Sequence, residues 1–339
     1  MTDRYSRQTL FFPNGEADQK RLGRARVALL GCGALGTVMA GLLVRAGVGF
    51  LRIVDRDFIE ASNLQRQTLF DEEDIRLGLP KAVAAARKLA VTNSEVQVEP
   101  QAVDFDADNA ERLIGDADLV MDATDNFEAR YLLNEVCAKL DKPWIYSAAV
   151  GSYGVTMNVR PGQTPCLRCV FPIAPTPGTT ATCDTAGIIG PIGGLIGSLA
   201  SAEALKLLIG AFDRLHSGLL WVDVWNNSFQ STPLGGPVKD CPTCQLHHYE
   251  YLEAGSSSRT ATLCGRGSVQ VRPARAREVR FEELGERLKS VGQASWNPYL
   301  LRFAVDSYEL TVFPDARAII KGTDDPAVAR SLYARYIGT

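Results

Sequence analysis

The feature that most constrains the fold of this chain is a glycine-rich turn, Gly31-Cys-Gly33-Ala-Leu-Gly36. The turn follows an apolar run at residues 26–31, which predicts a buried strand, and residues 34–46 then carry the pattern of a helix. Glycines in such a turn let the backbone approach a phosphate or ribose at the start of the helix. A second apolar run ends at Asp55, about 20 residues after Gly36, where a carboxylate can accept hydrogen bonds from ribose hydroxyls. The sequence therefore predicts a nucleotide-binding strand, turn and helix.

Strand and helix patterns alternate through the first 150 residues or so. Strands are expected at 26–31, 50–55, 95–100, 119–122 and 143–146, and helices at 34–46, 81–90 and 126–140. This alternation is typical of an α/β fold with a doubly wound, Rossmann-like, mostly parallel sheet that helices cover on both faces. Farther on we expect a strand at 154–159, a long crossover loop rich in Pro and Thr at 171–182, a helix at 196–208 and a strand at 218–224.

The chain has 339 residues, which exceeds the usual size of one domain. The main domain is expected to span residues 1–250. Residues 251–266 are predicted to be a linker, because their central part, residues 253–262, is small and polar without periodicity. Residues 267–339 predict a small α+β domain, with strands at 268–271, 299–304, 309–313 and 318–321 and helices at 281–290 and 327–336. The sequence leaves the role of this last domain open: the strands in residues 300–313 could pair with a partner or form the core of a docking domain, and the simplest interpretation is a stabilising appendage.

Charge and composition limit the partners and the compartment. Lys and Arg total 36 against 39 Asp and Glu, so a nucleic acid is not an expected partner. The N-terminus has no apolar leader, and we expect a cytoplasmic protein. Residues 185–202 are uncharged, but they contain Pro191 and several glycines, and Glu203 follows at once. This segment predicts a buried loop and helix, and no contact with a membrane is expected.

Charged and amide side chains gather in four short motifs of the main domain. They lie in Arg4-Tyr-Ser-Arg7-Gln8, Ser62-Asn63-Leu-Gln-Arg66-Gln67, Gly78-Leu-Pro-Lys81 and Asp122-Ala-Thr-Asp125-Asn126. Together with the glycine-rich turn, these motifs make residues 4–250 resemble the MoeB/ThiF family of adenylyltransferases, which is related to the ubiquitin-activating enzymes. The resemblance does not extend to the C-terminal unit.

The resemblance implies a role for each of these residues. Gly31, Gly33 and Gly36 would line the ATP site. Asp55 would hold the ribose, Asn63, Arg66 and Lys81 would face the phosphates, and Asp125 would coordinate Mg²⁺. Arg7 matches the family arginine that reaches across a homodimer into the ATP site of the partner. Each residue also has an ordinary interpretation, since Arg66 and Lys81 suit a surface, Asp125 suits a helix cap and Arg7 suits a solvated arm.

The resemblance also implies a reaction and its partners. A carboxylate attacks the α-phosphate of ATP while pyrophosphate leaves, so cations and Mg²⁺ must screen like charges. The carboxylate would be the C-terminal one of a ubiquitin-like sulfur-carrier protein, activated for thiocarboxylate formation in molybdopterin, thiamine or related biosynthesis. Some relatives carry a rhodanese domain that delivers sulfur through a cysteine. Residues 267–339 contain no cysteine, so a separate sulfur donor is expected.

The eight cysteines divide into distinct sets. Two C-x-x-C pairs can supply four thiolates to a closed, structural Zn²⁺ site, and the family has such a site at matching positions; the pairs are Cys166 with Cys169 and Cys241 with Cys244. Disulfides are the alternative, which a cytoplasmic location disfavours. The remaining cysteines other than Cys183, namely Cys32, Cys137 and Cys264, suit small apolar positions.

Cys183, at the end of the crossover loop, leaves the fate of the adenylate open. It could take the carrier as a thioester for protein conjugation, as in ubiquitin-activating enzymes, or be a bystander thiol. Two further alternatives are an NAD-binding oxidoreductase, which would leave Arg66, Lys81 and the cysteine pairs without a role, and a non-catalytic scaffold. A scaffold would be expected to lack some of the four polar residues that this chain retains, Arg7, Arg66, Lys81 and Asp125.

Overall fold

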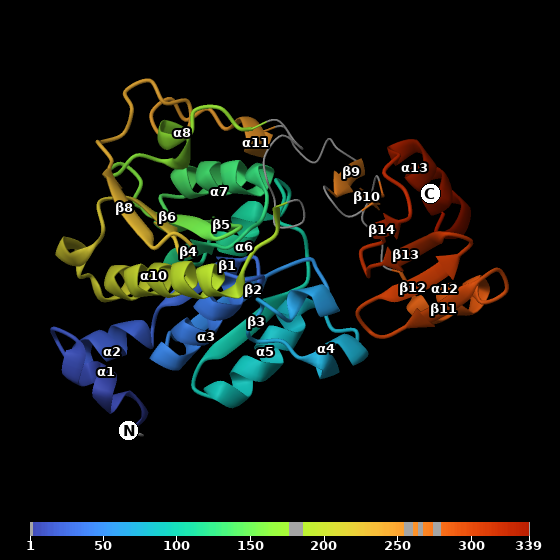
Figure 1. The fold of residues 1–339 in the computed structure, drawn as a ribbon, viewed down its shortest axis with the longest axis horizontal. Helices are drawn as coiled ribbons and strands as arrows, with labels where there is room; N and C mark the ends of the chain where they lie inside the picture. Colours follow the sequence, from blue (N-terminus) through green and yellow to red (C-terminus); the bar gives the residue numbers. More distant parts are fainter. Residues whose placement is uncertain (1–2, 176–185, 254–259, 264–266, 274–278, 339) are drawn as a thin grey trace. The chain divides into compact units, whose positions relative to one another are not determined.

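The computed structural model describes residues 3–175, 186–253, 260–263, 267–273 and 279–338. These residues belong to two units, Met1–Gly255 and Ser256–Thr339. Figure 1 shows the helices and strands of each unit.

The first unit is built on one sheet, in which eight strands lie within the described residues in the order β3-β2-β1-β4-β5-β6-β7-β8. Neighbours from β3 to β5 are parallel and those from β5 to β8 antiparallel. The strands are β1 (Arg26–Leu30), β2 (Phe50–Val54), β3 (Gln97–Gln101), β4 (Leu119–Asp122), β5 (Trp144–Val150), β6 (Tyr153–Val159), β7 (Gly218–Asp223) and β8 (Ser228–Pro233). The parallel part has the doubly wound order, so the predicted fold class is confirmed. Such sheets bind ligands at the carboxyl ends of their strands.

Helices cover both faces of this sheet (Figure 1). Helices α3, α5 and α10 lie on one face, and α6 and α7 lie on the other. The described helical elements are η1 (Asp3–Tyr5), α1 (Ser6–Phe11), α2 (Glu16–Leu22), α3 (Gly36–Ala46), η2 (Ala61–Asn63), α4 (Glu72–Arg76), α5 (Lys81–Thr92), α6 (Ala110–Ile114), α7 (Phe127–Lys139), α8 (Leu167–Val170), α10 (Gly190–Ile209), η3 (Phe212–Arg214) and α11 (Glu250–Glu253). Because both faces are covered, central strands such as β1 and β4 consist almost wholly of buried residues.

Helix α10 is the described helix that is long and apolar enough to cross a membrane, and half of its most apolar stretch is buried inside the protein. It packs on α3 and on strands β4, β5 and β6. Two glycines let α10 approach α3 closely: a Cβ at Gly193 would lie 3.1 Å from the Ala34 Cβ, and one at Gly197 would lie 2.9 Å from the Val38 Cβ. The uncharged composition of this segment therefore suits a core helix in close contact with its neighbour.

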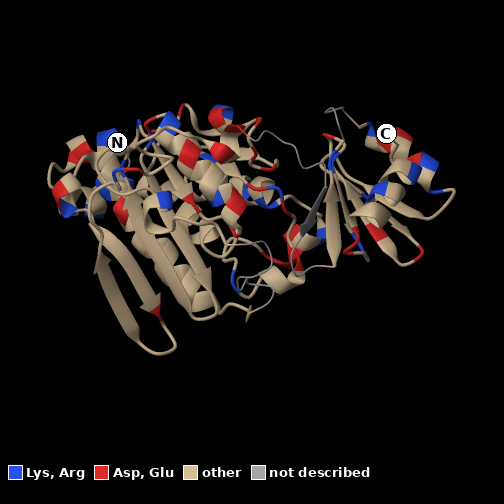
Figure 2. Cartoon of the chain, turned by 90° about the horizontal axis from the view of Figure 1, so that it is seen from above, with Lys and Arg blue, Asp and Glu red and all other residues tan. Residues whose placement is uncertain are grey.

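Charges are spread over the first unit without separation by sign. Figure 2 shows Lys, Arg, Asp and Glu interspersed along its helices and loops. The strands β7 and β8 differ, since Asp223 is their one charged residue. This distribution agrees with the near balance of charges in the sequence.

The second unit contains an antiparallel sheet, in which six described strands have the order β11-β12-β13-β14-β10-β9. Its elements are β9 (Thr260–Leu263), β10 (Ser268–Val271), α12 (Phe281–Leu288), β11 (Gln293–Trp296), β12 (Leu301–Val305), β13 (Tyr308–Val312), β14 (Ala318–Lys321) and α13 (Pro326–Tyr336). Helix α12 buries Phe281, Leu284 and Leu288, which share one face at helical spacing. They join Phe303 and Leu310 in one apolar cluster.

Strand β9 lies within residues 251–266, for which the sequence predicts a linker. It pairs antiparallel with β10, with Thr260 opposite Val271 and Leu263 opposite Ser268. Strand pairing joins backbone groups, and an edge strand needs no long apolar run. The sequence prediction therefore misses a strand here, because Thr-Ala-Thr-Leu is too short to show a pattern.

Candidate functional site

The glycine-rich turn connects β1 to α3 and leaves one open face. A Cβ at Gly31, whose φ is +89°, would overlap the carbonyl oxygen of Ala123, and a Cβ at Gly36 would overlap the carbonyl oxygen of Gly31. The packing of the protein itself therefore requires both glycines. Gly33 differs, because the nearest described heavy atom to such a Cβ is Gln67 Nε2 at 3.8 Å. No described contact requires glycine at position 33, and its open face leaves room for a ligand.

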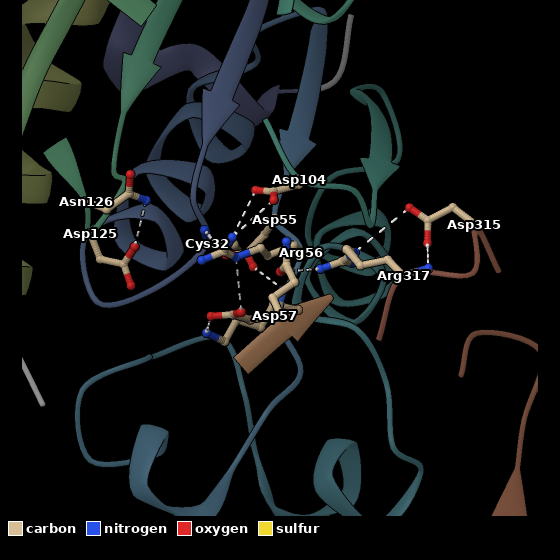
Figure 3. A network of polar contacts seen from close by, with 11 residues as sticks. Cys32, Asp55, Arg56, Asp57, Asp104, Asp125, Asn126, Asp315 and Arg317 are labelled. Atoms are coloured by element: carbon tan, nitrogen blue, oxygen red, sulfur yellow. Dashed lines mark hydrogen bonds and ion pairs between the residues drawn. The ribbon is translucent and has the colours of Figure 1, made fainter. Parts of the chain in front are cut away.

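Asp55 follows β2 and is fixed against this turn (Figure 3). Its Oδ2 accepts a hydrogen bond from the Cys32 backbone N–H at 2.6 Å, and its Oδ1 accepts one from the Asp57 N–H at 2.7 Å. Desolvation raises the pKa of the Asp55 carboxyl, and the ammonium of Lys81 opposes that rise. A carboxylate offers about four lone-pair sites, so two remain for ribose hydroxyls.

Lys81 is the first residue of α5 and is only 4% exposed. Asp57 holds it twice: Lys81 Nζ donates to Asp57 Oδ2 at 3.0 Å, and the Lys81 N–H donates to the Asp57 carbonyl at 2.9 Å. Arg56 pairs with Asp104 at 3.1 Å and lies 3.8 Å from Asp57. The ion pair between Lys81 and Asp57 is buried, so Lys81 is not an ordinary surface charge. The pair fixes the ammonium group of Lys81 close enough to Asp55 to act on its carboxylate.

The segment after β2 contributes the amide and guanidinium groups that the sequence singles out. Asn63 is 4% exposed, and its Oδ1 accepts a hydrogen bond from the Glu60 N–H at 3.1 Å. The half-buried Arg66 donates from Nη1 to the Ser62 carbonyl at 2.6 Å. Both side chains thus stabilise the turn formed by residues 60–66. This turn precedes Gln67, whose side chain lies near the glycine-rich turn.

The loop after β4 presents Asp125. Asp122 is fully buried and accepts hydrogen bonds from the Thr124 N–H at 2.9 Å and from the Thr124 Oγ1 at 2.7 Å. Arg130 of α7 lies 3.4 Å from Asp122 and donates to the Thr124 carbonyl at 2.5 Å. Asn126, not Asp125, caps α7, because its side chain accepts from the Ala129 N–H. The Asp125 carboxylate is exposed on a braced loop, which suits a ligand for Mg²⁺.

Asp55, Asp57 and Asp125 lie at one edge of the sheet, where β1, β2 and β4 end (Figure 3). The ion pair with Asp57 holds Lys81 at the same edge. Three residues that contribute there were not assigned roles from the sequence: Asp57, Gln67 and Arg130. The alternation Asp55-Arg56-Asp57 at a strand end is a signal for the first. An arginine placed directly before the apolar run Tyr131-Leu-Leu133 of α7 is a signal for Arg130.

Arg7 lies away from this edge in its own chain. It belongs to α1, and the next residue, Gln8, donates to the Ala46 carbonyl at 2.8 Å. Ala46 is the last residue of α3, whereas the glycine-rich turn precedes Gly36, the first. A helix of 11 residues is about 16 Å long, so α3 separates Arg7 from the turn.

The two C-x-x-C pairs meet in space. The Sγ atoms lie within 4.8 Å of one another, at 3.7 Å for Cys166 and Cys169, 3.6 Å for Cys166 and Cys241, and 3.5 Å for Cys169 and Cys244. A disulfide needs about 2.05 Å, whereas tetrahedral Zn²⁺ with Zn–S bonds of about 2.3 Å separates its sulfurs by about 3.8 Å. Asn134 of α7 braces the cluster, because it donates to Cys166 Sγ at 3.6 Å and accepts from the Leu167 N–H at 2.8 Å. The donor set fits Zn²⁺.

The other cysteines show no such cluster in the described part of the chain. Cys32 and Cys137 are buried and free, and burial raises the pKa of both thiols, as expected for small apolar positions. Cys183 and Cys264 lie outside the described residues.

Removal of the metal from the cysteine cluster is expected to lower the melting temperature by at least about 10 °C. Structural Zn²⁺ contributes directly to folding, and each kcal/mol lost lowers Tm by about 2–4 °C in a domain of this size. Calorimetry after chelation, with metal content by mass spectrometry, checks this. Cys244→Ser should lose the metal and Cys183→Ser should keep it; a chelated chain that melts unchanged would contradict a structural metal.

The fold and the site define a nucleotide-binding α/β domain that a four-cysteine cluster braces. The sequence model of the ThiF family matches residues 5–243, and the chain belongs to this family. The family expected from the motifs is therefore confirmed.

Relatives agree with this assignment. The sulfur carrier protein ThiS adenylyltransferase of Bacillus subtilis is 43% identical over the full length of both chains. The sulfur carrier protein adenylyltransferase of Thermus thermophilus is 39% identical and covers 71% of this chain and 90% of its own. Among solved structures, MccB of E. coli superposes with a TM-score of 0.64 at 25% identity, over 72% of this chain and 75% of that one.

Proposed function

We propose that this protein is an ATP-dependent adenylyltransferase that activates the C-terminal glycine carboxylate of a ubiquitin-like sulfur-carrier protein. The named activity of the B. subtilis relative supports this function, since the two chains match each other from end to end. The observation that carries the proposal is the edge of the sheet where the open face of Gly33, the fixed carboxylate of Asp55 and the buried ammonium of Lys81 lie together.

The chemistry needs what these residues offer. A carboxylate and a triphosphate are both anionic, so their approach requires positive charge at fixed positions. Lys81 and Arg66 supply cations, and the exposed carboxylate of Asp125 suits Mg²⁺, which neutralises the phosphates when it is bound. A carboxylate is already a competent nucleophile at neutral pH, so the site needs no general base.

The relatives favour this function over the alternatives. An NAD-dependent oxidoreductase would leave Asp125 and Lys81 without a role, and the named relatives are adenylyltransferases. The thioester route depends on Cys183. We retain thiocarboxylate formation with sulfur from a separate donor as the fate of the adenylate.

We further propose a homodimer in which Arg7 completes the site of the partner. The position of α1 beyond the far end of α3 supports this, because Arg7 is remote from its own glycine-rich turn. Leu10 and Phe11 on the same helix are 77% and 84% exposed. A second copy covering these apolar side chains would remove them from water.

The function is tested by ATP–pyrophosphate exchange with and without ubiquitin-like proteins that end in Gly-Gly. We expect exchange only with one such carrier, and a loss of at least about 10²-fold in Asp125→Asn, which keeps the side-chain size and removes the charge. The matched control is Asp141→Asn, an exposed aspartate at the opposite edge whose φ of +52° asparagine tolerates. Absence of exchange with every carrier, in a folded protein with bound metal, would contradict the proposal.

A further inference from the structure

Gln67 has a buried carboxamide with no described hydrogen-bond partner. The residue is 3% exposed, and its Oε1 is fully buried and unpaired. Its backbone is well fixed, because its N–H donates to the Asn63 carbonyl at 2.9 Å and its carbonyl accepts from the Phe70 N–H at 3.2 Å. The side chain is therefore held in a position that the protein interior does not satisfy.

Such an arrangement is unusual in a folded protein. Most buried side-chain polar atoms have a partner, and an unpaired one is destabilising. The neighbouring amide shows the contrast, since Asn63 uses its Oδ1 to accept from the Glu60 N–H. The unpaired Oε1 needs a donor. The other end of the amide, Nε2, also has no described acceptor, and a ligand that carries acceptor oxygens would pair with this donor end.

The position of the carboxamide indicates which ligand. Gln67 Nε2 is the nearest described atom to the open face of Gly33, 3.8 Å from where a Cβ would lie. That face is the part of the glycine-rich turn that no protein atom fills. Phosphate oxygens accept hydrogen bonds and do not donate them, so the N–H of an amide is the end that would contact them.

We propose that Gln67 is a nucleotide-contacting residue, whose Nε2–H donates to a phosphate oxygen of ATP bound over Gly33. This inference rests on the proposed function, because it assumes that ATP occupies this turn. The contact adds a neutral donor to the cations Lys81 and Arg66, and it provides a partner for the Gln67 amide only when nucleotide is present.

The variant Gln67→Met separates this role from a structural one. Methionine has a similar length and no polar end, so removal of the unpaired amide is expected to leave Tm unchanged or to raise it by about 2–4 °C. A lost hydrogen bond to a charged group is expected to lower kcat/KM for ATP in the exchange assay by about 10–100-fold. Gln67→Glu should raise the KM for ATP further, because its carboxylate repels phosphate. The matched control is Gln163→Met, at an exposed glutamine at the amino-terminal edge of the sheet.

The outcomes are distinct. If Gln67→Met lowers Tm and keeps kcat/KM for ATP within twofold of the unmutated protein, Gln67 is structural and the inference fails. If the unmutated protein shows no exchange, the proposed function fails; binding of Mg²⁺-ATP by calorimetry then tests Gln67 alone. A tenfold weaker binding in Gln67→Met supports the contact, whereas equal binding, or no binding by the unmutated protein, overturns it.

Discussion

Replacement of Lys81 by methionine is expected to lower the kcat of carrier-dependent ATP–pyrophosphate exchange by about 10³-fold, with a smaller change in the KM for ATP. Lys81 is 4% exposed and Asp57 holds its ammonium group at 3.0 Å, so the position of the charge is fixed before substrate binds. A fixed charge in a site shielded from water stabilises the crowded anions of the transition state more than a mobile one. Exchange rates over a range of ATP concentrations measure both constants.

The control for this substitution removes the partner charge as well. Lys81→Met alone removes the ammonium partner of Asp57 and leaves Arg56 at 3.8 Å as a neighbouring cation. Loss of one partner of a buried pair is destabilising by up to about 3–5 kcal/mol. The double variant Asp57→Asn with Lys81→Met removes both charges and is expected to recover most of the lost Tm while exchange stays low. Asp57→Asn alone should reduce exchange less, because it loosens Lys81 without removing it. A stable double variant that exchanges within tenfold of the unmutated rate would show that Lys81 only balances Asp57.

The sequence predicts the central strands and helices of the first unit well, because burial on both faces leaves a clear pattern. The strand Leu119–Asp122 has the predicted bounds, and α5 and α7 differ from prediction by one or two residues at their ends. Strands β8, β9 and β11 are missed. β8 is almost wholly exposed and β11 alternates between exposed and half-buried residues, so neither carries a continuous apolar run. Their stability comes from backbone pairing with neighbours that a linear pattern does not identify.

Some residues of the candidate site could likewise be predicted from the sequence, and others could not. Asp55 and the glycines have spacing that sequence alone can recognise, and the structure places them together. The contributions of Asp57, Gln67 and Arg130 depend on burial and on which group each one faces. An ion pair across 24 residues, or an amide without a partner, exists only after folding. Side chains of this kind are identified from tertiary structure rather than from motifs.

Mixing two inactive variants is expected to restore activity if Arg7 acts across a dimer. Arg7→Ala and Asp125→Ala should each lower exchange by at least about 10²-fold, because each removes a charged group from both sites of a homodimer. In a mixed dimer with two-fold symmetry, one site would combine the intact Asp125 of one chain with the intact Arg7 of the other, and the second site would lack both. Differently tagged chains, co-expressed and purified through both tags, give mixed dimers only.

These mixed dimers are expected to show about half the exchange rate of the unmutated dimer, since one of their two sites is complete. If Arg7 served its own chain, every site would carry one defect, and the mixture would be as inactive as its parents. The contact of Gln8 with Ala46 places Arg7 beyond the far end of α3, so an arrangement within one chain would require α1 to leave the surface that it occupies. Mixed dimers that form but remain inactive would therefore contradict the exchange of Arg7 between subunits, while leaving the assignment of Asp125 intact.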